Sequence, residues 1–506
     1  MYNSDCKDTN NSSFFILLFF VPLHPIMPII AVVVIYFSLL MVISRWTGRK
    51  ATNDAFYRGE RRSPWYMVAF GMVGASISGI TFVSVPGMVT SIGMTYLQTC
   101  MGFIVGYVVI AFVLLPLYYR LNLTTIYSYL GQRIGRRAYK TGASFFLLSK
   151  MTGAAVRFYV VCWILMTTGL GTTGHEGAVQ NGGLFALVVV VMTGLIWLYT
   201  RQGGIKTLVW TDALQTACLF GALILIIYKV IGDMGMTMGE AAAMIRDSEL
   251  SKVFVLDDWV SKQNFWKQFL SGAFIAIVMT GLDQDMMQKN LTCRSLRDAQ
   301  KDMCTYGMAF LPANLLFLSL GVLLTIWYQR HGLSVSAGDD LLPQYISLTA
   351  YLSPLTSCIF ILGMVAAAFS SADSALTALT TSYCVDICER ADDERLRRRV
   401  HIIMAVVFVV FILLFRVLNS TSVIDAIYIL CSYTYGPLLG LFAFGLLTRR
   451  TTYDRMVPYI CIASPVACYL LDLLLGQCTG YRFGYELLML NGFLTFCGLW
   501  VMSKKE

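Results

Sequence analysis

Charged residues are scarce in this chain: of its 506 residues, only 13% are Asp, Glu, Lys or Arg, whereas 57% are hydrophobic. A soluble globular chain has about 25% charged residues and about 45–50% apolar ones. So few charges argue against a cytosolic enzyme, a disordered chain and a secreted disulfide scaffold. About 20 apolar residues cross a bilayer once, so the chain has room for about a dozen spans. The composition therefore predicts a polytopic membrane protein.

The sequence also lacks the patterns of a zinc protein. Its four histidines are scattered (His24, His175, His331 and His401), and it contains neither an HExxH motif nor a CxxC pair. Most of the cysteines lie inside apolar runs, where cysteine packs as a small hydrophobic residue. These absences argue against a zinc hydrolase and against a structural zinc site.

Thirteen apolar stretches are predicted to be membrane-spanning helices, which makes the fold class all-α. They cover residues 27–45, 65–91, 95–119, 140–170, 183–200, 207–232, 265–285, 303–327, 352–386, 399–417, 422–447, 455–475 and 483–502. A shorter apolar stretch at 14–22 is interrupted by prolines and is not counted as a span. Residues 1–26 are therefore predicted to be an external segment, either signal-like or preceding a true start at Met27.

Basic residues gather in alternate loops between the predicted spans. These loops contain Arg49–Arg62, Arg133–Lys140, Arg201–Lys206, Lys289–Lys301, Arg390–Arg399, Arg449–Arg455 and Lys504–Lys505. Because short cytoplasmic loops are enriched in Lys and Arg, the alternation predicts an external N-terminus and a cytoplasmic C-terminus. The net charge of +9 is then a topology signal and not a nucleic-acid site. We expect the protein in the cell membrane, which in a bacterium is the inner membrane, with the lipid bilayer as its surroundings.

The predicted external loop at 233–264 is the longest one and contains six acidic residues against Arg246, Lys252 and Lys262. Apolar and charged residues alternate along 236–264. This pattern is typical of an amphipathic helix that lies on the bundle or at the membrane interface.

The predicted span at 65–91 contains a run of small and hydroxylated residues, Gly74-Ala-Ser-Ile-Ser-Gly79, followed by Pro86-Gly87. Such a run favours an unwound, discontinuous helix, whose freed carbonyl groups can bind a cation and whose half-helix ends can face a solute. The alternative is a close helix–helix contact through small residues.

The span at 352–386 places Ala367, Ser370, Ser371 and Ser374 on one helical face, with Asp373 beside it. Hydroxyl and carbonyl oxygens in a row suit a hard monovalent cation. The alternative is that each serine donates to a carbonyl of its own helix.

Ionisable residues inside spans are costly and are therefore functional candidates. Asp212 lies about two turns into its span and needs a cation or a hydrogen-bond donor. Lys150 is near the cytoplasmic end of its span and is expected to extend toward water. Arg157 lies deeper, where its guanidinium suits bidentate capture of a carboxylate. Its alternative role is a structural pair with Asp212 or Asp373.

At these residues the sequence resembles the sodium/solute symporter family, which includes bacterial galactose, proline and sialic acid transporters. The resemblance covers the chain from about residue 27. The matching stretches are Gly74–Gly79 with Pro86-Gly87, Leu123–Leu130, Gly203–Gln215, Asp283-Gln284, Ala367–Ser374 with Asp386, and Tyr435–Gly440. It implies a LeuT-like core of two inverted five-helix repeats, at 65–232 and 265–447. One extra helix at 27–45 would precede the core, and two helices and a tail would follow it at 455–506.

The resemblance also implies binding sites. For the principal sodium ion it implies Gly74, Ile77, Ala367, Ser370 and Ser371. For a second sodium ion, similar to that of the sialic acid transporters, it implies Asp212, Ser370, Asp373 and Ser374. Asp373 stands where those members have a hydroxyl, which leaves open whether one or two ions bind. For the solute it implies Ser76, Ser78, Thr81, Gln98 and Arg157.

The resemblance therefore implies a sodium-coupled symporter that imports a carboxylated solute, first an acidic sugar, by alternating access. A neutral sugar, another organic acid or an amino acid remains an alternative solute. A different class is an intramembrane aspartyl protease with Asp212 and Asp373 as its dyad, but such enzymes need a GxGD setting for one aspartate, and Ser371-Ala372-Asp373 lacks it. The oligomeric state stays open.

Overall fold

The computed structural model describes residues 26–49, 52–166, 182–259, 261–334, 338–349, 354–418, 423–479, 481 and 483–504. The predicted external segment 1–26 lies outside these ranges except for its last residue. The same is true of the last four residues of the span predicted at 140–170. Nearly all of the described chain is helical, as the sequence predicts.

Two consecutive sets of helices form the body of the molecule. The first set is α4 (Trp65–Ser76), α5 (Gly79–Ile92), α6 (Tyr96–Val109), α7 (Leu115–Arg120), α9 (Arg136–Ile164), α11 (Gly182–Thr200) and α12 (Ile205–Asp233). The second is α14 (Phe265–Ala276), α15 (Gln284–Asn290), α16 (Leu296–Arg330), α18 (Pro354–Ser382), α19 (Glu394–Leu418) and α20 (Val423–Leu447). Flanking the two sets are α2 (Ile26–Thr47), α21 (Val457–Thr479) and α22 (Leu487–Val501).

Each set opens with a helix that bends sharply. The bend between α4 and α5 is 59°, and the bend between α14, extended by a π-helical turn at Ile277–Gly281, and α15 is 69°. Within the described ranges, nine further helices are long and apolar enough to cross a membrane, or eleven spans if each bent pair counts as one. The thirteen predicted spans all overlap these segments or the shorter apolar helices at Ala31–Thr47 and Leu487–Val501.

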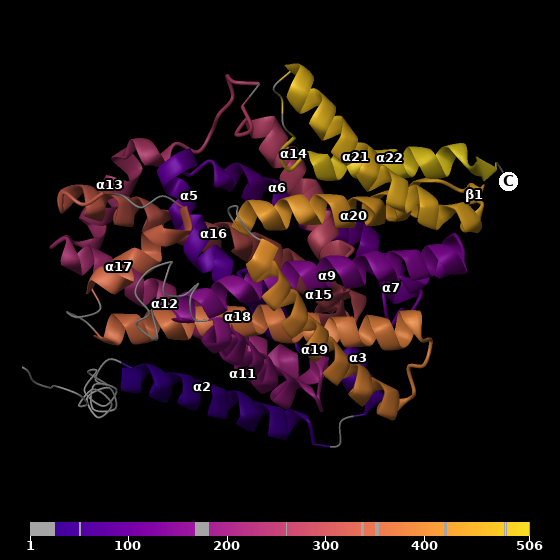
Figure 1. Cartoon of the computed structure of the whole chain (residues 1–506), viewed down its shortest axis with the longest axis horizontal. Helices are drawn as coiled ribbons and strands as arrows, with labels where there is room; N and C mark the ends of the chain where they lie inside the picture. Colours follow the sequence, from indigo (N-terminus) through magenta and orange to yellow (C-terminus); the bar gives the residue numbers. More distant parts are fainter. Residues whose placement is uncertain are drawn as a thin grey trace, which may run out of the picture.

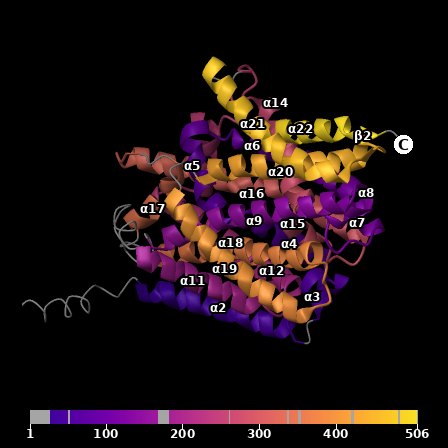
Figure 2. The ribbon, with the colours of Figure 1, turned by 45° about the vertical axis from the view of Figure 1, so that its right-hand side comes forward.

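The long helices run side by side, with α2 along one edge of the molecule and α21 and α22 along the opposite edge (Figures 1 and 2). At the centre, α12 packs between α4 and α18. Outward-facing side chains on the peripheral helices are apolar and exposed, for example Val34, Val410 and Leu474. In a bilayer such a surface faces lipid, so the exposed apolar residues agree with a membrane protein.

Short helices cap the two ends of the bundle. Helices α13 (Met238–Asp247) and α17 (Leu341–Thr349) lie at one end, and α3 (Asn53–Arg58), α7 and the C-terminus lie at the other (Figure 1). At that second end, Thr451–Thr452 (β1) pairs with Ser503–Lys504 (β2). The basic loops that contain α3 and α8 (Ser128–Arg133) therefore lie at the same end as the C-terminal tail, as the charge alternation requires.

The long loop between the two sets is less helical than expected. Its helix, α13, begins with a capping box of Thr237 and Glu240 and ends at Asp247, and it packs against α16. A single 3₁₀ turn follows at Glu249–Ser251, and the described residues from Lys252 to Asn264 are irregular. The amphipathic pattern thus predicted the helix but overestimated its length.

Candidate functional site

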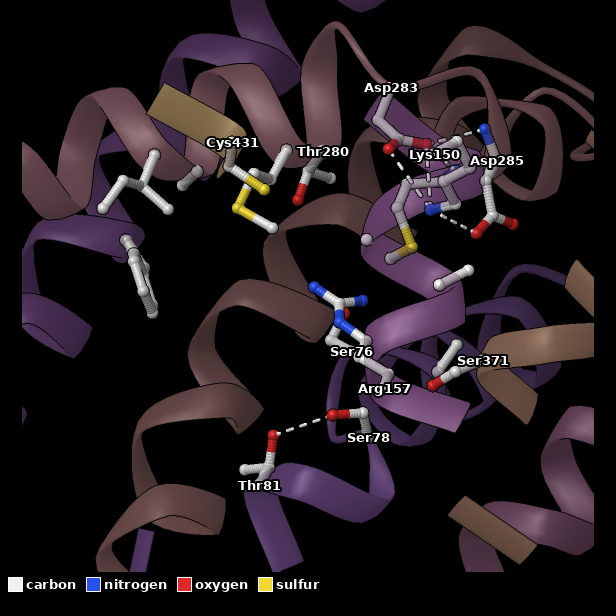
Figure 3. A pocket seen from close by; sticks show the side chains of 18 of the residues that line it. Ser76, Ser78, Thr81, Lys150, Arg157, Thr280, Asp283, Asp285, Ser371 and Cys431 are labelled. Atoms are coloured by element: carbon white, nitrogen blue, oxygen red, sulfur yellow. Dashed lines mark hydrogen bonds and ion pairs between the residues drawn. The ribbon is translucent and has the colours of Figure 1, made fainter. Parts of the chain in front are cut away.

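A cavity lies at the centre of the bundle, where both bent helices meet α6, α9, α16, α18 and α20 (Figure 3). Four of the five predicted solute-binding residues line it, namely Ser76, Ser78, Thr81 and Arg157. Ser371, a predicted sodium ligand, lines it as well. The sequence therefore identified side chains that the fold brings to one place from three separate helices.

The break in the first bent helix supplies the cavity with free backbone groups. Helix α4 ends at Ser76, and its last backbone bond runs from Ile77 N to Val73 O. The carbonyls that follow, Gly74 among them, have no donor within the helix. Ser78 begins α5 without a side-chain cap, so the first N–H groups of α5 are also left without a helical partner. Both the expected break and the expected close contact are present, because a Cβ at Gly74 would meet Thr216 Oγ1 of α12 at 2.0 Å.

Hydroxyl groups and aromatic rings cover one wall of the cavity. Ser76 Oγ lies 2.6 Å from the hydroxyl of Tyr306, which lies 2.9 Å from that of Tyr107. Ser78 Oγ lies 3.4 Å from Thr81 Oγ1. The rings of Tyr107 and Tyr306 are 4.6 Å apart. This wall offers hydroxyl hydrogen bonds next to flat apolar faces, a combination that suits a ring with several hydroxyl groups.

Arg157 extends from α9 into the cavity, which Ser76 also lines (Figure 3). Within the described part of the chain it forms no hydrogen bond and no ion pair. The alternative pairing with Asp212 or Asp373 is not formed, since both carboxylates have other partners. An arginine at this depth without a protein partner is available for an anionic ligand.

Lys150 does not extend toward water as expected. Its side chain is 11% exposed, and its ammonium lies 3.2 Å from Asp283 Oδ2 and 2.6 Å from Asp285 Oδ2 (Figure 3). The expectation was wrong because α15 turns back into the bundle after the bend and brings two carboxylates beside α9. Tyr435 of α20 donates a hydrogen bond of 2.5 Å to Asp283.

Gln98 is buried, but it does not line the cavity. Its amide nitrogen donates to Gln263 O at 2.9 Å, and its amide oxygen accepts from Val255 N at 3.2 Å. Both ends of the side chain thus hold the long loop between the two sets of helices against α6. In this conformation Gln98 can influence a solute only through that loop.

The predicted ligands of the principal sodium ion lie where α4 breaks and α18 passes it. Helices α4 and α18 are in contact, and Ser371 donates a 3.2 Å hydrogen bond to Ala367 O. In this structure Ser371 therefore donates to a carbonyl of its own helix, which was the alternative expectation. Its oxygen lies in the same cavity as the break. Unwound carbonyls and serine hydroxyls are oxygen ligands of the kind that Na+ takes at broken helices, so these residues fit the ion.

The four residues of the predicted second sodium site are close together and fully buried. Ser370 Oγ donates to Asp212 Oδ1 at 2.8 Å, and Ser374 Oγ donates to Asp373 Oδ1 at 3.2 Å. The hydroxyl of Tyr199 donates to Asp373 Oδ2 at 2.5 Å. The chain thus brings two carboxylates to one place between α12 and α18.

Lys289 is also part of this cluster, and the sequence assigned it to a cytoplasmic loop. That assignment is wrong: its ammonium lies 2.8 Å from Asp212 Oδ2, and the two side chains are only 2% and 1% exposed. Asp285 and Lys289 are the site residues that sequence reasoning missed. Their signal was the spacing of four residues, which places two opposite charges on one face of a helix.

Three comparisons with known proteins agree on what the chain is. Residues 56–454 match the sodium:solute symporter family. The sodium/sialic acid symporter SiaT of Proteus mirabilis is 22% identical over 84% of this chain and 86% of its own length. The corresponding symporter NanT of Aliivibrio fischeri is 23% identical over 82% of each chain.

A solved Na+-coupled sialic acid symporter superposes with a TM-score of 0.77 at 18% identity, covering 95% of this chain and 99% of that one. It shows that the fold is that of the LeuT-like transporters, as predicted. Family and relatives are transporters, which excludes the aspartyl protease alternative and any other enzyme. The chain therefore belongs to the sodium:solute symporter family of integral membrane proteins, which couple the movement of a solute to that of sodium.

Proposed function

We propose that the protein imports a carboxylated solute together with sodium, and that the solute is an acidic sugar of the sialic acid kind. The observation that carries this proposal is the guanidinium of Arg157, which lies in the central cavity without a partner among the described residues. Its charge calls for an anion, and the hydroxyl groups and aromatic rings beside it suit a sugar ring. The similarity to two bacterial sodium/sialic acid symporters supports the same solute class.

Sodium binds, in this proposal, between the break of α4 and the serines of α18. The ligands are the backbone oxygens of Gly74, Ile77 and Ala367 with the hydroxyls of Ser370 and Ser371. An ion there links the first set of helices to the second and stabilises the form in which the solute pocket is complete. Each sodium ion that enters also contributes about 2.3 kcal/mol per 100 mV of membrane potential.

The proposed orientation has an external N-terminus and a cytoplasmic C-terminus in the cell membrane. Its support is the gathering of the basic loops at the end of the bundle where the C-terminus lies. Import then means that solute enters from the end that carries α13 and α17. Attaching a protease site after Lys504 and cleaving it in intact cells and in open membranes tests this orientation.

The test of function is uptake into proteoliposomes with an inward sodium gradient. The solutes offered are radiolabelled N-acetylneuraminate, a neutral sugar, a short-chain monocarboxylate and an amino acid. We expect accumulation of N-acetylneuraminate that stops when the sodium gradient is dissipated. Uptake of only the neutral sugar would overturn the acidic solute, and uptake driven by protons alone would overturn the sodium coupling.

Arg157→Ala sharpens this test. Loss of a buried charged hydrogen bond costs about 2–5 kcal/mol, which raises the half-saturating concentration of an acidic solute at least about 30-fold. Equilibrium binding of sodium should stay within a factor of about two, since Arg157 is not among the proposed sodium ligands. Arg137→Ala is the matched control, because Arg137 lies on the exposed end of the same helix. An unchanged solute affinity in Arg157→Ala would remove this residue from the site.

A further inference from the structure

Lys289 is a buried cation that the transport mechanism described so far does not use. It lies in α15, the second arm of the second bent helix, and the 69° bend directs its side chain toward α12. Its ammonium is 2.8 Å from Asp212 Oδ2, while the other carboxylate oxygen of Asp212 accepts the hydroxyl of Ser370 at 2.8 Å. Both oxygens of Asp212 therefore already have partners within the chain.

The other groups around Lys289 make it the only cation of the cluster within the described residues. Asp212, Asp285 and Asp373 are the carboxylates that act on it electrostatically. Asp285 has its own ammonium, that of Lys150 at 2.6 Å. Asp373 has none and is held by Tyr199, Gln215 and Ser374.

A sodium ion at Asp212 would have to share this carboxylate with the ammonium. Two cations within a few ångströms repel each other strongly where side chains exclude water. The ammonium is part of the chain, cannot leave, and has the same charge as the ion it would displace. A buried carboxylate needs one such charge, and Lys289 already provides it.

We propose that the ammonium of Lys289 takes the place of a second sodium ion at Asp212, so that each transport cycle uses one sodium ion, bound between α4 and α18. This inference rests on the proposed sodium coupling. It also explains why one chain can have all four residues of a second sodium site without binding an ion there. Lys289 thereby sets the ratio of sodium to solute, and with it the steepest solute gradient the protein can build.

Lys289→Gln tests the proposal, because it removes the charge and keeps a polar side chain of similar length. The first measurement is the number of ²²Na+ ions bound per purified chain at equilibrium, which requires no solute. We expect one ion for the natural chain and two for Lys289→Gln. The sodium dependence of N-acetylneuraminate uptake should change accordingly, from a Hill coefficient near one toward two.

Three further variants separate this role from a purely structural one. Lys206→Gln is the matched control: Lys206 lies on α12, as Asp212 does, but its pair with Glu60 is partly exposed, so one ion is expected. Lys289→Arg keeps the charge and should also bind one. The double variant Asp212→Asn/Lys289→Gln has neither charge and should again bind one, even if Lys289→Gln alone fails to fold.

The outcomes are distinct. Two ions in the natural chain, or an unchanged count of one in folded Lys289→Gln, would overturn the role of Lys289 and leave sodium coupling intact. Two ions in the double variant would overturn it as well, since the second ion would then not depend on Asp212. No sodium binding by any variant would instead overturn the proposed function itself.

Discussion

The two bent helices occupy the same place in the two halves of the chain, but their breaks are closed in different ways. At the first break, Ser78 begins α5 without a side-chain hydrogen bond to the backbone N–H groups of the helix. At the second, Asp283 accepts from the N–H groups of Asp285 and Met286 and so caps α15. The first N–H groups of α5 therefore have no side-chain acceptor at the first break, whereas Asp283 accepts from those of α15 at the second.

The two breaks also differ in charge. The residues from Gly74 to Thr81 include no ionisable side chain, whereas Asp283, Asp285 and Lys289 lie along the second break. Lys150 and Tyr435 fasten the second break to α9 and α20. The proposed function places an exchangeable ion and solute at the first break, which requires groups that are left free there. At the second break the same kind of bend is closed by ion pairs within the chain.

The largest expected effect comes from removing the ion pairs of Lys150 with Asp283 and Asp285 at the second break. Lys150→Met leaves Asp283 and Asp285 buried without their cation, which costs about 3–5 kcal/mol of stability. The measurement is thermal unfolding of the purified protein in detergent, followed by tryptophan fluorescence. Lys140→Met is the control on the same helix, because its pair with Glu389 is partly exposed and is worth about 1 kcal/mol or less. Equal losses for the two variants would mean that the second break does not depend on this cluster.

A smaller effect is expected from crowding the first break. In Gly74→Ala the new Cβ would meet Thr216 of α12 at 2.0 Å from Oγ1 and 3.0 Å from Cα, so the helices have to move apart. Overpacking of this kind costs about 1–3 kcal/mol. Gly281→Ala is the counterpart beside the second break, where the nearest atoms are the ends of the flexible side chains of Leu114 and Ile110.

Thermal unfolding and sodium-driven uptake of both glycine variants decide this point. We expect Gly74→Ala to be the more damaging, and Thr216→Ala in the same chain to restore part of the loss by removing the hydroxyl. If Gly281→Ala is equally damaging, close packing is a property of both breaks and does not distinguish the first.

The sequence predicted the first break but not the bend and the ion pairs of the second. The run of small residues predicted the break at Ser76–Gly79, and hydroxyl spacing predicted the face of α18, because both are local patterns with a fixed period. The directions of Lys150 and Lys289 depend on the second bend, which turns α15 into the bundle. Hydropathy detects no bend, so a lysine just beyond an apolar run was assigned to a loop.

Gln98 was misjudged for a related reason. Only the family resemblance implied Gln98 as a solute ligand, on the helix that follows the first break. Its hydrogen bonds to Val255 N and Gln263 O involve a loop more than 150 residues away in the sequence, and that loop has no periodic pattern. Long-range partners of a polar side chain are set by packing and not by local spacing.

The smallest expected effect comes from removing one hydroxyl group beside each break. Ser371 faces the first break, and Thr280 lines the cavity beside the second. Ser371→Ala removes one proposed sodium ligand. By analogy with a hydrogen bond to a charged group, this costs about 1.5 kcal/mol, or about a tenfold rise in the half-saturating sodium concentration.

Thr280→Val removes a hydroxyl of the same cavity that is not a proposed ligand, so sodium affinity should stay within a factor of about two. Both values come from the sodium dependence of N-acetylneuraminate uptake and, without solute, from ²²Na+ binding. A rise in Ser371→Ala alone would place the ion at the first break. Equal rises in both variants would mean that sodium contacts both breaks, and the division between an open and a closed break would no longer hold.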